Sequence, residues 1–214
     1  ANEDNLSGGD GDDTITGAAG ADAINGGAGD DTITGGAGED VLVGGAGSDT
    51  FLLDVTGSLN TMLSSRNTIQ DFVPGADKFK VDDAHSTANV SKLTGTNAWT
   101  SSAAIQGHSA SGNLTVVAAT KVVRITVENA SSFSDDGATV LDALVSGAGS
   151  GTITTPANAV VLFTVYDGTD TAIYLGAADT TGGGDTNIAQ AEIVLVTTLE
   201  GVNHTALAYD DFEN

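Results

Sequence analysis

Aspartate residues recur at a fixed interval in the first quarter of the chain. From residue 8 onward the sequence divides into five consecutive units of nine residues, and each unit has glycine at its first position and aspartate at its sixth. A partial unit before residue 8 adds one more aspartate. The series is Asp4, Asp13, Asp22, Asp31, Asp40 and Asp49. Carboxylate oxygens are preferred ligands of hard divalent cations. The spacing therefore predicts an array of metal-binding carboxylates.

The other positions of each unit indicate how the aspartates are held. The eighth position is always large and apolar, and its residues are Leu6, Ile15, Ile24, Ile33, Leu42 and Phe51. The last three residues of a unit, such as 14–16, form a minimal strand with the apolar side chain inward. Glycines at positions one, two and four permit the positive φ of a tight turn. One unit cannot bury its own apolar residue, so we expect the units to stack as a solenoid with two units in each coil.

Units of the same parity then lie above one another. Asp4, Asp22 and Asp40 form a ladder along one edge and the other three aspartates form a second ladder, with rungs about 4.8 Å apart. Carboxylates this close repel unless a cation lies between them, and Ca²⁺ fits better than Mg²⁺ because it accepts six to eight oxygens in irregular geometry. Four neighbouring pairs predict about four ions, with weaker half-sites at the ends. Backbone oxygens of the turn glycines are the expected additional ligands: Gly9, Gly11, Gly26, Gly27, Gly29, Gly35, Gly36, Gly38, Gly44, Gly45 and Gly47.

Composition agrees with a cation as the partner. The 214 residues carry 29 acidic and 6 basic side chains, and residues 1–53 hold 11 acids and no lysine or arginine. This charge disfavours nucleic acid and anionic lipid surfaces. The absence of cysteine excludes disulfides and thiolate metal sites. No apolar run approaches the roughly 18 residues of a membrane span, so we expect no membrane insertion, and no N-terminal export signal is visible. A flexible glycine-rich linker is the alternative, but it does not explain the regular apolar positions.

These residues resemble the glycine- and aspartate-rich nonapeptide array of the RTX (repeats-in-toxin) family, which implies a parallel, calcium-binding β-roll. Only the second unit departs from the pattern, with Ala18 in place of its second glycine and Ala23 after its aspartate.

Residues 67–81 resemble the strand, turn and strand that close the array in RTX exoproteins. Two interpretations of their aspartates remain open. Asp71 and Asp77 could ligate one more calcium, or Asp71 caps a turn and Asp77 begins the next strand. We therefore divide the chain into a β-roll at 1–53, its closing strands at 54–83 and a third region at 84–214.

The third region is predicted to be mostly β. Its apolar, β-branched runs predict strands at 114–118, 121–127, 159–166, 171–175 and 192–198, with a hairpin turn at 166–171. One short helix is expected at 134–145. The fold class is thus all-β: a parallel β-roll followed by a mostly β domain. The acidic, aromatic end of the chain resembles the C-terminal secretion signal of type I-secreted RTX proteins.

No catalytic motif of the common hydrolase, metalloprotease or nucleotide-binding kinds occurs in the sequence, and His85, His108 and His204 are expected in solvated loops. We therefore predict no enzymatic activity. The leading hypothesis is the C-terminal part of a secreted bacterial surface-layer or adhesin-like protein, with calcium, an ABC exporter and either cell-surface polysaccharide or self-assembly as partners. The alternative is the calcium-binding tail of a secreted protease or lipase, and the start of the array in mid-unit at Ala1 leaves it open.

Overall fold

The computed structural model describes residues 2–53, 66–81, 105–108, 114–115, 122–126, 153–154, 160–177, 187–188 and 193–213. Within these ranges the chain is built of strands and one 3-10 turn, η5 (Tyr209–Asp211), which confirms the all-β class. The helix expected at 134–145 lies outside the described residues. No helix in the described part of the chain is long and apolar enough to cross a membrane.

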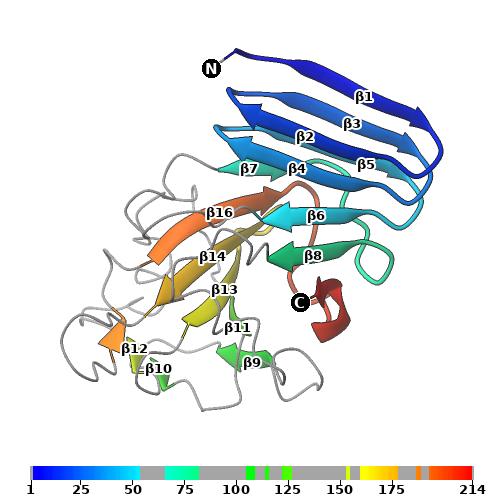
Figure 1. Cartoon of the computed structure of the whole chain (residues 1–214). Helices are drawn as coiled ribbons and strands as arrows, with labels where there is room; N and C mark the ends of the chain where they lie inside the picture. The colour runs from blue at the N-terminus through cyan, green and yellow to red at the C-terminus, as the bar shows by residue number, and fades with distance from the viewer. Residues whose placement is uncertain are drawn as a thin grey trace.

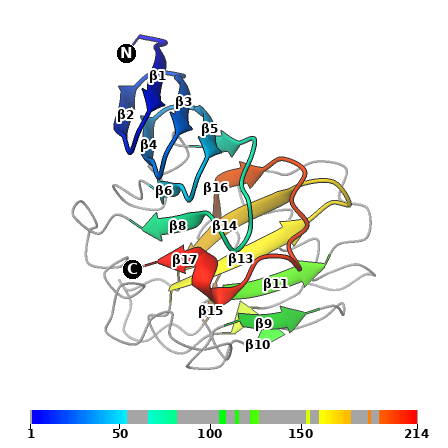
Figure 2. The same cartoon turned by 90° about the vertical axis from the view of Figure 1, so that its right-hand side faces the viewer.

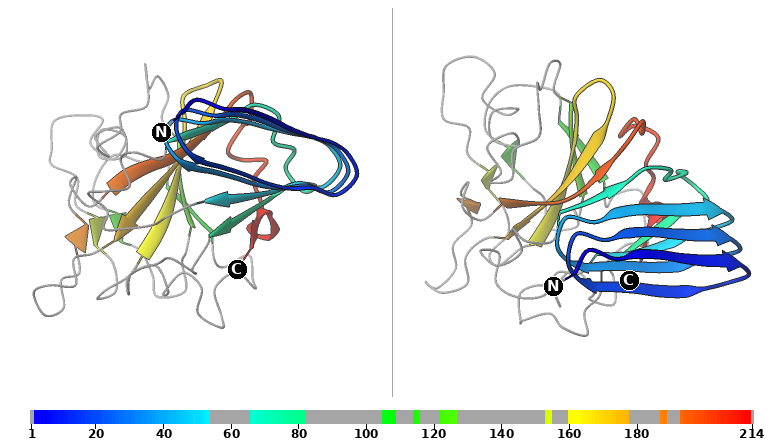
Figure 3. Two further views of the ribbon diagram at one scale, coloured as in Figure 1. Left: turned by 45° about the horizontal axis from the view of Figure 1, so that its top comes forward. Right: turned by 90° about the horizontal axis from the view of Figure 1, so that it is seen from above.

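Six N-terminal strands form a flattened coil. They are β1 (Asn5–Asp10), β2 (Thr14–Ala19), β3 (Ala23–Ala28), β4 (Thr32–Ala37), β5 (Val41–Ala46) and β6 (Thr50–Leu53). Odd and even strands belong to two separate sheets, and all neighbours in each are parallel. Ile24 pairs with Leu42 and Ile33 with Phe51, so each strand pairs with the strand two units later, as predicted. Seen along the stacking direction, the coils superpose as one loop (Figure 3).

The apolar eighth positions form two columns inside the coil. Ile24, Ile33, Leu42 and Phe51 are at most 2% exposed, while Leu6 and Ile15 at the N-terminal end are partly buried. The complete strands are six residues long because positions one to three continue the strand begun at position seven. Glycines at positions two and four have positive φ, whereas those at position one do not, which corrects part of the turn prediction.

Residues 67–81 add a further coil. β7 (Asn67–Ile69) extends the odd sheet, where Ile69 pairs with Leu42, and β8 (Lys78–Val81) extends the even sheet, where Phe79 pairs with Phe51. Neither strand ends its sheet. β16 (Ile193–Leu199) pairs in parallel with β7, and β17 (Phe212–Glu213) pairs in parallel with β8. The sheets of the roll therefore continue into the last part of the chain (Figures 1 and 2).

Beyond β16 the odd sheet runs on through β14 (Thr171–Ala177), β13 (Val160–Tyr166), β11 (Val122–Thr126) and β9 (Ile105–His108), making nine strands in all. β13 and β14 form the predicted antiparallel hairpin. A third sheet has three strands, β10 (Leu114–Thr115), β12 (Ile153–Thr154) and β15 (Asn187–Ile188). Each of the five strands expected after residue 84 is thus represented. Four of them continue the nine-stranded sheet of the roll, and the one expected at 114–118 lies in the three-stranded sheet as β10.

The C-terminal end packs into the core of the roll. The Phe72 and Phe79 rings stack with centroids 4.2 Å apart, and Phe212 lies 5.5 Å from Phe79. His204 is 1% exposed with its ring centroid 5.4 Å from that of Tyr166, so the expectation of a solvated loop was wrong for this histidine. His85 lies outside the described residues, and His108 ends β9.

Candidate metal centre

The repeat aspartates stack as two hydrogen-bonded ladders. One carboxylate oxygen of each accepts the backbone N–H of the aspartate one coil earlier. The Oδ1 atoms of Asp22, Asp31, Asp40 and Asp49 accept from residues 4, 13, 22 and 31 at 2.8 to 2.9 Å. These four side chains are only 1 to 2% exposed. The strand register therefore holds the carboxylates in line at one-strand spacing.

The second carboxylate oxygen has no such partner. Oδ2 of Asp13, Asp22, Asp31 and Asp40 is buried and accepts no hydrogen bond in the structure. Burial raises the pKa of the Asp40 carboxyl, and the neighbouring Asp22 charge raises it further, against the lowering effect of its backbone hydrogen bond. Burial likewise raises the pKa of Asp49. A buried carboxylate oxygen without donor or counter-ion is costly, so these atoms require a cation.

The first-position glycines lie where these carboxylate oxygens come close to the backbone of a neighbouring coil. A Cβ on Gly8, Gly17 or Gly26 would lie within 3.0 Å of two oxygens: Oδ2 of the aspartate in its own unit and the carbonyl oxygen of the first-position glycine two units later. Glycine is needed at this position for space, since φ there is not positive. A carboxylate oxygen and a carbonyl oxygen that approach the same point form an oxygen cradle suited to a hard cation. Three such cradles lie in the described roll.

The predicted glycine ligands lie where the coils stack. Those at positions two and four have positive φ: Gly9, Gly11, Gly27, Gly29, Gly36, Gly38, Gly45 and Gly47. From the third unit on, a Cβ at these positions would meet the backbone of the preceding coil, as Gly27 meets the Gly9 carbonyl. Gly26, Gly35 and Gly44 are first-position residues. Ligation of calcium by these backbone oxygens remains a prediction.

The residues fit calcium better than a metal that needs several side-chain ligands. Among the described residues no group of three or more histidine, aspartate or glutamate side chains is placed to hold one ion. An ion in this roll would take two carboxylates and complete its shell with backbone carbonyls, which Ca²⁺ accepts readily. Asp4 is exposed, so the Asp4/Asp22 pair at the N-terminal end is the most open of the four.

Asp71 and Asp77 use both of their carboxylate oxygens to accept backbone hydrogen bonds. Asp71 accepts from Gly44 N–H at 2.9 Å and from Gly45 N–H at 2.8 Å, so its carboxylate holds strand β5 rather than a turn of its own segment. Asp77 accepts from Asp49 N–H at 3.0 Å and Val73 N–H at 2.7 Å, and therefore occupies the ladder position that follows Asp49. Burial raises the pKa of Asp77. Calcium ligation by either residue remains a prediction.

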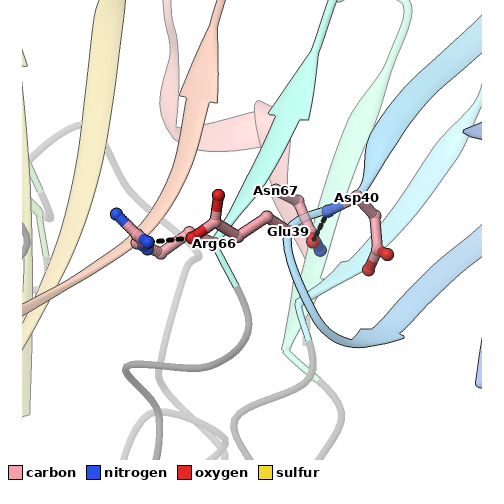
Figure 4. Close-up of polar contacts among 4 residues, drawn as sticks. All are labelled: Glu39, Asp40, Arg66 and Asn67. Carbon is pink, nitrogen blue, oxygen red and sulfur yellow. Dashed lines mark hydrogen bonds and ion pairs between the residues drawn. The ribbon is translucent and has the colours of Figure 1, made fainter. Parts of the chain in front are cut away.

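Sequence reasoning missed two residues of this region. Asn67 occupies the ladder position after Asp40, because its Oδ1 accepts the Asp40 N–H at 3.3 Å (Figure 4). The sequence could have identified Asn67, since residues 67–69 repeat the pattern of residues 31–33 with asparagine in place of aspartate. Asp211 is fully buried and accepts hydrogen bonds from Gly75 N–H at 2.7 Å and Ala208 N–H at 2.6 Å. No local pattern in the sequence points to this second residue.

Comparison with known proteins identifies the array. A family model described as RTX calcium-binding nonapeptide repeat (4 copies) matches residues 1–33 and 19–51. The N-terminal segment is therefore an array of RTX repeats, and calcium is the cation that such repeats bind. The chain is also similar to the solution structure of the AlgE6R3 subunit from the Azotobacter vinelandii mannuronan C5-epimerase, with 22% identity, a TM-score of 0.43 and coverage of 99% of this chain and 78% of that one. No curated protein sequence matches the chain.

Proposed function

We propose that this chain, with its array of RTX calcium-binding repeats, is the C-terminal region of a type I-secreted bacterial cell-surface protein of the surface-layer or adhesin kind. In this proposal the roll folds when it binds Ca²⁺ outside the cell. The observation that carries it is the set of buried Oδ2 atoms without donors on Asp13, Asp22, Asp31 and Asp40. They give the folded roll a requirement for cations that the unfolded chain does not have.

Coupling of folding to calcium follows from the charge of the roll. Residues 1–53 carry 11 acids and no lysine or arginine, so the metal-free segment repels itself. An ion that binds only the folded form stabilises that form in proportion to its concentration. Extracellular calcium modules have dissociation constants of about 10⁻⁴ to 10⁻³ M, far above free calcium in a cytosol. The roll would therefore remain unfolded until export.

Two features of residues 84–214 support a cell-surface parent. This region is rich in threonine, serine, alanine and valine, and it is much longer than an export signal alone requires. In the proposal the last residues address an ABC exporter, and the exported protein meets either a polysaccharide surface or further copies of itself. We propose no catalytic role for these residues.

Folding of the whole chain on calcium addition tests the first half of the proposal. Circular dichroism of the full chain in chelator, then with millimolar Ca²⁺ and separately with millimolar Mg²⁺, should show a gain of β signal with Ca²⁺ alone. The whole chain is needed because β16 and β17 pair with strands of the roll. A β spectrum that is complete in chelator, or equal for the two metals, would contradict the proposal.

Export is tested separately with a passenger that stays unfolded in the cytosol, fused to the N-terminus of the chain. Expressed in bacteria with and without a type I exporter, the fusion should reach the medium only when the exporter is present. Retention in both strains, despite calcium binding by the purified fusion, would remove the secretion role and leave the calcium role intact.

A further inference from the structure

The two edges of the roll end differently. We call the line of Asp4, Asp22 and Asp40 the first edge, and the line of Asp13, Asp31 and Asp49 the second edge. The next ladder position on the first edge is Asn67, whereas on the second edge it is Asp77. Both residues accept the N–H of the preceding aspartate, so their backbone role is the same. Only one of them brings a negative charge.

Asn67 places a donor where the other rungs place an acceptor. A Cβ on Gly35 would lie within 3.0 Å of Asp40 Oδ2 and of Asn67 Nδ2. In the three cradles at Gly8, Gly17 and Gly26 the second group is a carbonyl oxygen. The orientation of the amide is fixed because its Oδ1 accepts the Asp40 N–H. A cation at this position would lose an oxygen ligand and face an amide nitrogen.

The residue before Asn67 is paired with an acid on the other side of the chain. The Arg66 guanidinium forms an ion pair with Glu39, the neighbour of Asp40, and Figure 4 shows this pair and the Asp40 carboxylate on opposite sides of Glu39. Arg66 is the first basic residue in the sequence. The pair is partly exposed and contributes little stability by itself, and the Glu39 carboxylate offsets the charge of the guanidinium.

Asn67 also connects the roll to the sheet that follows. The carbonyl oxygen of Asn67 accepts a hydrogen bond from the Thr197 hydroxyl of β16 at 2.9 Å, with Thr197 fully buried. β16 contributes Leu195, Val196 and Leu199 to the buried apolar residues. A neutral rung at β7 lets the metal-binding coils meet an apolar sheet without burying another charge.

We propose that Asn67 terminates the calcium ladder on the first edge, its amide standing in for the ion that would otherwise follow Asp40. This inference rests on the proposed calcium role of the roll. It makes the number of ions on this edge a property of one residue: asparagine at 67 ends the series, and aspartate would extend it by one site.

Calorimetric titration of the full chain with Ca²⁺ tests the termination. Asn67→Asp should bind about one more ion than the unchanged protein. The matched control is Asn203→Asp, since Asn203 is exposed and its Oδ1 is likewise an acceptor, for Thr205 N–H at 2.9 Å. This variant adds the same charge away from the ladder and should leave the number of ions unchanged.

Thermal melts complete the test. At a calcium concentration that only just folds the unchanged protein, Asn67→Asp should melt below it, because the variant buries a second carboxylate beside Asp40, and millimolar Ca²⁺ should close that gap. An unchanged number of ions in Asn67→Asp, or a variant that stays unfolded in Ca²⁺ while Asn203→Asp folds, would overturn the termination. Absence of calcium binding by the unchanged protein would instead remove the proposed function itself.

Discussion

The roll and the sheet that continues it bury different kinds of side chain. In the roll only the eighth position of each unit places a large apolar residue in the core, and the buried sixth position is a carboxylate. In β14 residues 171–176 are all buried, and β13 beside it buries Leu162, Phe163 and Val165. The roll therefore depends on cations to become stable, whereas β13 and β14 are stabilised by apolar packing. One sheet of nine strands thus contains two sources of stability.

The two regions are joined at two pairs of strands. β7 pairs with β16 and β8 pairs with β17, so the end of the roll is covered by residues 193–213. Asp211 also holds the turn at Gly75, and Phe212 packs on Phe79. An apolar sheet that forms first would offer the last coil an edge on which calcium-dependent coils can stack.

Removal of calcium is expected to have the largest effect and to separate the two regions. In chelator, amide hydrogen exchange followed by mass spectrometry should show lost protection in residues 2–53 and retained protection in residues 160–177. Readdition of millimolar Ca²⁺ should restore the first set. Equal loss in both regions would mean that they form one cooperative unit and that the difference in buried groups does not divide their stability.

Phe212→Ala tests whether the C-terminal end of the chain stabilises the roll. Truncation of a buried phenylalanine typically costs about 3–5 kcal/mol, and Phe212 is 3% exposed at the end of the aromatic stack. In calcium the free energy of unfolding of the roll should fall by this order, measured by denaturant titration. Val73→Ala is the control, since Val73 is 53% exposed and its loss should change little. Equal effects of the two variants would show that the C-terminus does not support the roll.

Asparagine substitutions along the first edge test whether the calcium ions lie between successive rungs. Asp22 faces a rung on either side, whereas Asp40 is followed by Asn67. Asp22→Asn should therefore lose about two calcium ions and Asp40→Asn about one, and the retained Oδ1 preserves the backbone hydrogen bond. Calorimetric titration gives the numbers. Equal losses would show that the ions do not lie between successive rungs.

Protons should partly replace calcium in the metal-free roll. The pKa values of Asp40, Asp49 and Asp77 are raised by burial, so the folded form binds protons more strongly than the unfolded form. The contribution of these groups to stability is therefore full below the ordinary aspartate pKa of about 3.9 and is lost as pH rises through the raised values. In chelator, circular dichroism should show more ordered roll at the acid end of this window, and a loss of signal on acidification would contradict it.

Ala18→Gly is expected to have the smallest effect. Ala18 has φ of 80°, while every other described residue with positive φ is glycine. Left-handed backbone costs a non-glycine residue about 1–2 kcal/mol, and Ala18→Gly removes this cost. Glycine is also more flexible in the unfolded chain, which offsets part of the gain in stability. The free energy of unfolding of the roll should therefore rise by up to about 1 kcal/mol. Denaturant titration in calcium measures the change. The neighbouring Ala19→Gly should lower the same free energy, and a similar loss in both variants would remove the argument from strain.

The sequence by itself determined the repeating part of the molecule. A regular period of nine fixes which residues share a face and which lie two units apart, so the two sheets, the apolar columns and the aspartate ladders all follow from spacing. It also predicted the β13–β14 hairpin, because a short turn joins neighbouring strands. These features depend on contacts that are local or strictly periodic.

Tertiary structure decided what happens where the period ends. Ile69 pairs with Leu42 and Phe79 with Phe51, which no longer follows the two-unit offset of the coils, and β16 and β17 reach the roll from the far end of the chain. Such pairings have no repeat to set their register, so the sequence predicts a closure at 67–81 where the structure has another coil. The burial of His204 and the need for space at first-position glycines arise in the same way. Each depends on which distant atoms come close, and spacing along the chain does not specify that.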